Sequence, residues 1–132
     1  MERLFRFPAA SRRDPAVEAW FDARNDERGL LARHWFEVMR ACGDDVRDVL
    51  HDRQPTACVG DAAFAYVDAF SAHVNVGFFH GNDLPDPAAL LLGAGKFMRH
   101  VKLVPGCAVD DAALRRLIAD AYHDMRVRLR RA

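Results

Sequence analysis

The sequence lacks the features that mark several large classes of protein. No apolar run approaches the ~20 residues that a helix needs to cross a bilayer. Residues 1–8 have no apolar segment of the kind found in secretory signal peptides. The formal net charge is zero, whereas nucleic-acid-binding domains usually have a basic surface. We therefore expect a cytoplasmic protein with no membrane partner and no nucleic-acid ligand.

Nucleophilic residues are also scarce. The two serines, Ser11 and Ser71, stand outside any Gly-x-Ser-x-Gly motif. The three cysteines, Cys42, Cys58 and Cys107, are far apart, odd in number and without a Cys-x-x-Cys pair. This pattern indicates reduced thiols in the cytosol rather than a disulfide framework. No catalytic residue is assigned, and the balance is against an enzyme without excluding one.

What is present suits one soluble domain. The 132 residues are 51% apolar, which is enough for a core, and 29% charged. Residues 54–95 contain neither Lys nor Arg, so we expect them to form the buried centre of a sheet. We assign residues 1–132 to a single domain, with residues 1–13 as a loosely packed N-terminal arm.

Capping residues and apolar residues at helical spacing predict three helices in the first part of the chain. The first begins at Asp14, Gly29 divides it from the second, and Asp44 caps a short third helix that Pro55 ends. A further short helix is expected over 86–92, and a last one begins at Asp110.

Short apolar runs separated by tight turns predict strands over 56–59, 62–70, 73–79 and 98–104. Side-chain alternation in the second run places Phe64 and Tyr66 on the same face. Connections this short imply antiparallel neighbours. The order α-α-α-β-β-β-α-β-α predicts an α+β fold, with a mostly antiparallel sheet of about four strands and helices packed on one face.

Four acidic residues are spaced at four in the first helical segment and form a candidate metal site. They are Asp14, Glu18, Asp22 and Asp26. Like charges at this spacing repel each other, and hard oxygen ligands suit iron, manganese, calcium or magnesium. The alternative is a solvated helix face, neutralised by nearby arginines.

A glycine-rich turn followed by basic residues is a candidate anion site. Gly93-Ala94-Gly95-Lys96 does not match a phosphate-binding loop, because Phe97 follows the lysine and a strand follows the turn. Backbone amides of such a turn can still hold an anion. The candidate ligand-binding residues are His80, Lys96, Arg99, His100 and Lys102. The alternative is that the glycines serve only a helix end and a tight reversal.

One face of the predicted sheet is polar. If the register allows it, His73 and Asn75 lie near His100 and Lys102, with Tyr66 and Asp68 on the neighbouring strand. Histidine and carboxylate together can bind a metal or transfer protons. A solvated sheet face explains the same residues.

Residues 77–102 form a dense motif that resembles one family. Its parts are Gly77-Phe78-Phe79-x-Gly81, Leu84-x-Asp86-Pro87, Leu91-Leu92-Gly93-x-Gly95-Lys96 and Met98-Arg99-His100-Val101-Lys102. They resemble the signature of the YdhG-like bacterial domains, a frataxin-like family of mostly unassigned function. One branch is viewed as an intracellular iron chaperone. The resemblance makes iron the expected metal at the acidic residues.

Three readings of function remain. The first, which follows from the resemblance, is a cytosolic protein that binds ferrous iron and passes it to a partner protein. The second is a pocket protein or enzyme for a small anionic ligand, using the basic turn. The third is a structural module that forms a homodimer through its open sheet face.

Overall fold

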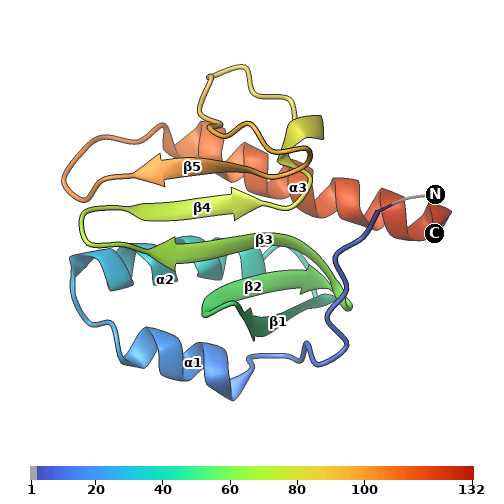
Figure 1. The fold of residues 1–132 in the computed structure, drawn as a ribbon, viewed down its shortest axis with the longest axis horizontal. Coiled ribbons are helices and arrows are strands. Elements are labelled where there is room, and N and C mark those ends of the chain that lie inside the picture. The colour runs from blue at the N-terminus through green and yellow to red at the C-terminus, as the bar shows by residue number, and fades with distance from the viewer. Residues whose placement is uncertain (1–2) are drawn as a thin grey trace.

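A computed structural model describes residues 3–132 (Figure 1). The order of elements along these residues is α1 (Pro15–Asp22), α2 (Glu27–Arg40), β1 (Val46–His51), β2 (Gln54–Val59), β3 (Ala62–Ala69), β4 (Val74–Phe78), the 3-10 turn η1 (Gly81–Asp83), β5 (Arg99–Leu103) and α3 (Asp111–Arg131). The five strands form one antiparallel sheet in chain order. The predicted α+β class is confirmed, with one strand more than expected.

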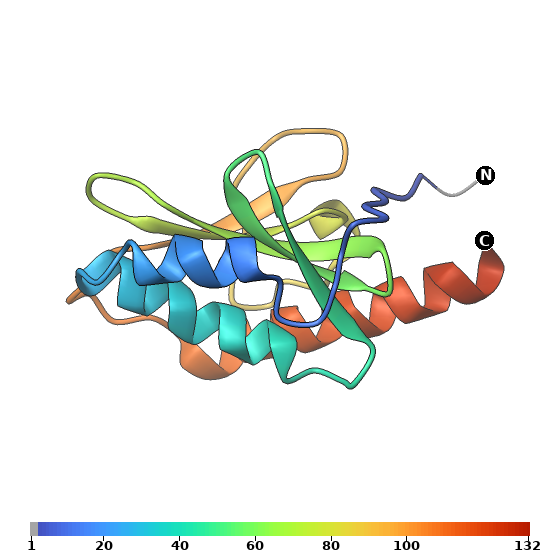
Figure 2. The same cartoon turned by 90° about the horizontal axis from the view of Figure 1, so that it is seen from below.

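The helices cover one face of the sheet, as predicted. α2 and α3 pack across β3, while α1 lies beside β1 at the edge of the sheet (Figures 1 and 2). The main core fills the space between these layers, and its largest fully buried side chains include Trp35, Phe21, Phe36, Phe64 and Phe78. We call the opposite side of the sheet the outer face.

The predicted helix after Asp44 is wrong, because residues 46–51 form strand β1. Val46 pairs with Val59 in β2, and the ladder continues to His51. The apolar residues of this segment mimic helical spacing because one inward-facing position is a carboxylate. That residue, Asp48, is only 1% exposed and pairs with Arg40 of α2. A buried ion pair therefore replaces the apolar residue that would have revealed the strand.

The first two helices separate earlier than the sequence predicts. α1 ends at Asp22, and Asp26 caps α2 by accepting a hydrogen bond from the backbone N–H of Gly29 at 2.9 Å. Gly29 thus lies inside the first turn of α2 and is not the break. A Cβ atom at Gly29 would lie 1.9 Å from the carbonyl oxygen of Arg24, so glycine allows the two segments to pack closely.

The predicted helix over 86–92 is also wrong, although Asp86 does accept backbone hydrogen bonds. Its two carboxylate oxygens bind the N–H groups of Leu90 and Leu91, each at 2.9 Å. Leu92 then forms a two-way backbone bridge with His100 of β5, at 2.7 and 2.9 Å. The segment is a loop that ends against the edge of the sheet.

Strand β3 contains a bulge at Phe64. The register between β2 and β3 shifts at Cys58, which leaves Phe64 as an extra residue. Phe64 and Ala65 consequently both face the helices, and Tyr66 faces outward. The prediction that Phe64 and Tyr66 share a face is therefore wrong.

The N-terminal arm is not loosely packed. Its backbone bonds to β3, where Phe5 accepts from the N–H of Ala63 at 2.8 Å, and Ser11 exchanges two hydrogen bonds with Asp48. Phe5 and Phe7 cover a second apolar cluster on the outer face. Residues 1 and 2 of the predicted arm lie outside the described residues. Within residues 3–132 no helix is long and apolar enough to cross a membrane.

Candidate functional site

The four carboxylates of the predicted metal site do not share one helix face. Only Glu18 and Asp22 lie within α1, because Asp14 and Asp26 are the N-caps of two different helices. The Asp14 carboxylate accepts from the N–H of Ala16 at 2.9 Å. The backbone N–H of Gly29 and then the guanidinium of Arg28 lower the pKa of Asp26. Both capping carboxylates are thus already engaged.

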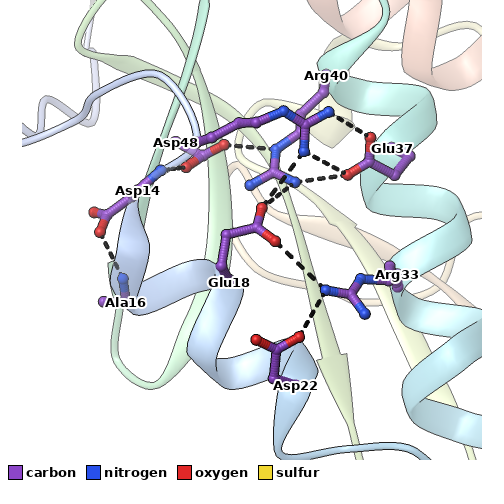
Figure 3. Close-up of polar contacts among 9 residues, drawn as sticks. Asp14, Ala16, Glu18, Asp22, Arg33, Glu37, Arg40 and Asp48 are labelled. Atoms are coloured by element: carbon purple, nitrogen blue, oxygen red, sulfur yellow. Dashed lines mark hydrogen bonds and ion pairs between the residues drawn. The ribbon is translucent and has the colours of Figure 1, made fainter.

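Glu18 and Asp22 belong to a cluster of ion pairs, which we call the Arg40 network (Figure 3). Its members are Glu18, Asp22, Glu37 and Asp48 with Arg13, Arg33 and Arg40. Within it, Glu18 lies 2.8 Å from a nitrogen of Arg40 and 3.4 Å from one of Arg33. Asp22 lies 3.1 Å from Arg33. Each carboxylate of the predicted stripe therefore already has a partner.

Arg40 is the centre of this network. Its side chain is 8% exposed, and its Nε donates to Asp48 Oδ2 at 2.7 Å. A second nitrogen donates to Glu37 at 2.6 Å. Although burial opposes the shift, hydrogen bonds from Arg40 and Arg13 hold the pKa of Glu37 below its usual value. The network joins α1, α2 and β1, so its first role is to hold these elements together.

These carboxylates are not arranged as a metal site. Within the part of the chain that the structure describes, no group of three or more His, Cys, Asp or Glu residues is placed to hold a metal ion. Iron binding stays a prediction of the resemblance.

The five residues of the predicted anion site lie in different environments. Arg99 donates to the carbonyl oxygens of Gly95 and Met98, at 2.6 and 2.7 Å, and so closes the glycine turn. Lys96 lies over the ring of Phe97, 5.3 Å from its centroid. The carbonyl groups of Gly95 and Met98 thus bind a cation of the chain itself, and anion binding by Lys96 and Arg99 stays a prediction.

The remaining three residues are separated as well. His80 is 5% exposed, and its Nε2 bonds to the carbonyl oxygen of Arg3 at 2.7 Å. Burial lowers the pKa of His80. His100 and Lys102 face outward from β5, on the side of the sheet away from the helices. His80 therefore supports the N-terminal arm.

The polar outer face forms as the sequence predicts. Asp68 pairs with Asn75, and Asn75 pairs with Lys102, so these residues form one row across three strands. Gln54 of β2 extends the row by donating to Asp68 at 2.9 Å. Burial, and then the nearby His73, lower the pKa of His100. The row is thus a set of polar side chains on the outer face, held together by strand pairing.

The three cysteines are free thiols, as predicted. Burial raises the pKa of Cys58 to about 12 and that of Cys42 to about 11, so both are protonated near neutral pH. Cys107 is exposed.

A cavity of about 570 Å³ lies at the carboxyl end of β5, and we call it the β5 pocket. The start of α2, the loop before Leu92, strand β5 and the loop before α3 surround it. In Figure 1 the start of α2 and the loop that follows β5 lie at the left end of the molecule, and the loop before Leu92 rises above β5. Buried or half-buried aliphatic residues contribute to its wall, namely Leu31, Leu90, Val101 and Leu103.

The rim of the β5 pocket is unusually apolar for a surface. Four of the large apolar side chains exposed on the described residues line it: Leu30 (56%), Leu92 (48%), Val104 (41%) and Val109 (37%). Single exposed apolar residues are common, but a group around a cavity indicates a binding site.

Three charged residues line the same pocket. Asp110 caps α3 by accepting from the N–H of Ala113 at 3.0 Å. Glu27, in the first turn of α2, and Lys102 of β5 form no ion pair or side-chain hydrogen bond within residues 3–132. An apolar cavity with two unpaired charges of opposite sign is the arrangement best suited to take a ligand.

Of the residues that line the β5 pocket, the sequence analysis predicted only Lys102 as a ligand-binding residue. The pocket draws residues from four separate segments, and no spacing rule connects them. Val104 and Val109 stand in a loop rich in Pro, Gly and Ala. Aliphatic residues in such a loop were the one feature of the sequence that could have indicated the pocket.

Comparisons with known proteins add no relative. No family model matches the chain, and neither the curated proteins nor the solved structures contain a match. The resemblance to the YdhG-like domains stays a prediction.

Proposed function

We propose that this chain is a binding protein that takes a small, mainly apolar ligand in the β5 pocket. The observation that supports this is the cavity itself. Its volume of about 570 Å³ falls within the range typical of small-molecule sites, and such sites combine apolar walls with a few polar groups. The apolar rim residues would leave water when a ligand binds, which contributes roughly 25 cal/mol per Å² of apolar surface covered.

The proposal retains part of the second reading from the sequence. Both proposals place a ligand in a pocket, and both include Lys102 among its contacts. They differ because the surface that contacts the ligand here is mainly apolar. Lys96, Arg99, His80 and His100 are not among the residues that line the cavity.

A neutral fluorescent dye such as Nile red tests the proposal without relying on any charge. We expect its fluorescence to rise with saturation at one dye per chain. Val109→Glu should abolish this binding, because it places a charge on the apolar rim. Val127→Glu is the matched control, since Val127 is also 37% exposed but lies on α3 away from the pocket.

Circular dichroism and thermal unfolding show whether each variant folds. Leu30→Glu, at a residue that is 56% exposed, serves as a second pocket variant if Val109→Glu unfolds the protein. Equal loss of dye binding in the pocket variants and in Val127→Glu would overturn the proposal. Absence of dye binding in a folded protein would do the same. If the chain also sedimented as a dimer that Val109→Glu dissociates, the pocket would be a self-association surface.

A further inference from the structure

We infer that the ligand of the β5 pocket is a short apolar peptide with both termini free. The inference rests on the proposed function and adds the chemical class of the ligand. Three features of the pocket support it: an open backbone position on β5, unpaired charges on opposite sides, and the apolar rim between them.

The open backbone position is Lys102. β5 is an edge strand, and His100 uses its outward N–H and C=O to bridge Leu92. In an antiparallel sheet, alternate residues of a strand direct both backbone groups to the same side. The N–H and C=O of Lys102, two residues further on, therefore also point away from β4, toward the pocket side. The described residues provide no backbone partner for them.

The open edge is short. On one side of Lys102, the backbone groups of His100 are bonded to Leu92. On the other side, the carbonyl oxygen of Val104 accepts a hydrogen bond from the N–H of Cys107 at 3.0 Å. Among the described residues of this stretch, Lys102 is the one whose outward N–H and C=O both lack a backbone partner. Peptides bind strand edges through such backbone pairs, and neighbouring pockets take their side chains. One open pair suits a peptide of two or three residues rather than a long strand.

The charges suit the two ends of such a peptide. The Lys102 side chain faces outward from the sheet, and Glu27 lies in the helical layer, so they flank the pocket from opposite sides. A ligand with an ammonium group at one end and a carboxylate at the other complements both. We assign the peptide carboxylate to Lys102 and its ammonium group to Glu27.

Calorimetry with the dipeptide Leu-Leu and its blocked forms tests this assignment. We expect Leu-Leu to bind about two- to fivefold more tightly than either N-acetyl-Leu-Leu or Leu-Leu amide, the range of a solvent-exposed ion pair. Lys102→Ala should remove the preference for the free carboxylate and keep the preference for the free amine. Glu27→Gln should do the reverse. Lys96→Ala, the change of the other lysine in the chain, is the matched control and should alter neither preference.

Backbone pairing has its own test. Methylation of the peptide nitrogen of Leu-Leu leaves both charges in place and removes the N–H that would donate to the carbonyl oxygen of Lys102. We expect affinity to fall about fivefold or more, the equivalent of one hydrogen bond of about 1 kcal/mol.

The outcomes separate this inference from the proposed function. If Nile red binds and Leu-Leu does not displace it, the peptide inference is overturned and the apolar pocket stands. Equal affinity for free and blocked dipeptides would also overturn it. If neither dye nor dipeptide binds the folded protein, both the pocket proposal and the peptide inference fail.

Discussion

The charged residues of the Arg40 network are paired with one another, whereas two charged residues of the β5 pocket have no partner. In the network, the buried guanidinium of Arg40 contacts three carboxylates, and Arg13 and Arg33 neutralise the rest. Glu27 and Lys102 line the pocket and have no ion-pair partner among the described residues. Two carboxylates of the network, Glu18 and Asp22, stand out in the sequence, and the network serves the fold. The pocket is inconspicuous in the sequence and is the better candidate for a ligand, because its charges are still unsatisfied.

The largest effect is expected from breaking the network at its centre. Asp48→Asn leaves the charge of Arg40 buried beside a neutral amide. Removing one partner of a buried ion pair typically costs about 3–5 kcal/mol of unfolding free energy. Urea denaturation at pH 7 measures the change. Asp44→Asn, at an exposed neighbour, is the control and should change stability little. A loss below about 1 kcal/mol for Asp48→Asn would show that the network is not structural.

A smaller loss of unfolding free energy is expected when the pH is lowered, because His80 then becomes protonated. Burial lowers the pKa of His80 in the folded state, so the unfolded state binds a proton more readily. The stability from neutral His80 is therefore complete above the unfolded pKa of about 6.5 and is lost as pH falls below it. We expect unfolding free energy to decrease between pH 7 and pH 5.5, and His80→Gln to reduce this slope. An identical slope in the variant would contradict the prediction. The carboxylates with lowered pKa, such as Glu37, act at lower pH.

The pocket charges should contribute little to stability, in contrast to Asp48. Glu27→Gln and Lys102→Ala each change a side chain with no partner in the described chain. Surface changes of this kind usually stay within about 0.5 kcal/mol. Thermal and urea unfolding of both variants measure this. A loss above about 1 kcal/mol in either would mean that the pocket charges also support the fold.

No effect at all is expected at the predicted iron site. The resemblance predicts ferrous iron binding, which anaerobic calorimetry measures. A variant with Asp14, Asp22 and Asp26 changed to Asn keeps both helix caps, because Asn caps as well as Asp. We expect its iron affinity to equal that of the unaltered protein. A clear loss of iron binding, with unfolding unchanged, would restore these carboxylates as the metal site.

Local signals in the sequence predicted much of the fold. Asp14 and Asp110 cap the helices they were expected to cap, and the turns at Gly60 and Ser71 separate antiparallel strands. These features depend on a residue and its near neighbours. The failures depend on distant partners. Asp48 faces inward in a strand only because Arg40 neutralises it, and no pattern within residues 44–55 reveals that partner.

The candidate site was harder to predict for the same reason. Leu30 and Val109 lie far apart in the sequence, and each alone fits an ordinary surface residue. The bulge at Phe64 and the loop held by Asp86 decide which residues meet at each end of the sheet. The row from Asp68 through Asn75 to Lys102 was predicted on the condition that the register allows it. A short turn joins β3 to β4, whereas residues 79–98 separate β4 from β5, and both pairings are found.

The attachment of the N-terminal arm has a consequence for synthesis of the protein. The bond between His80 and the carbonyl oxygen of Arg3 joins positions 77 residues apart. At typical ribosomal rates of about 5–20 residues per second, roughly 4–15 seconds pass between the two. Phe5 and Phe7 therefore leave the ribosome well before Phe79, the residue that they contact on the outer face. During that interval both side chains are available to a chaperone.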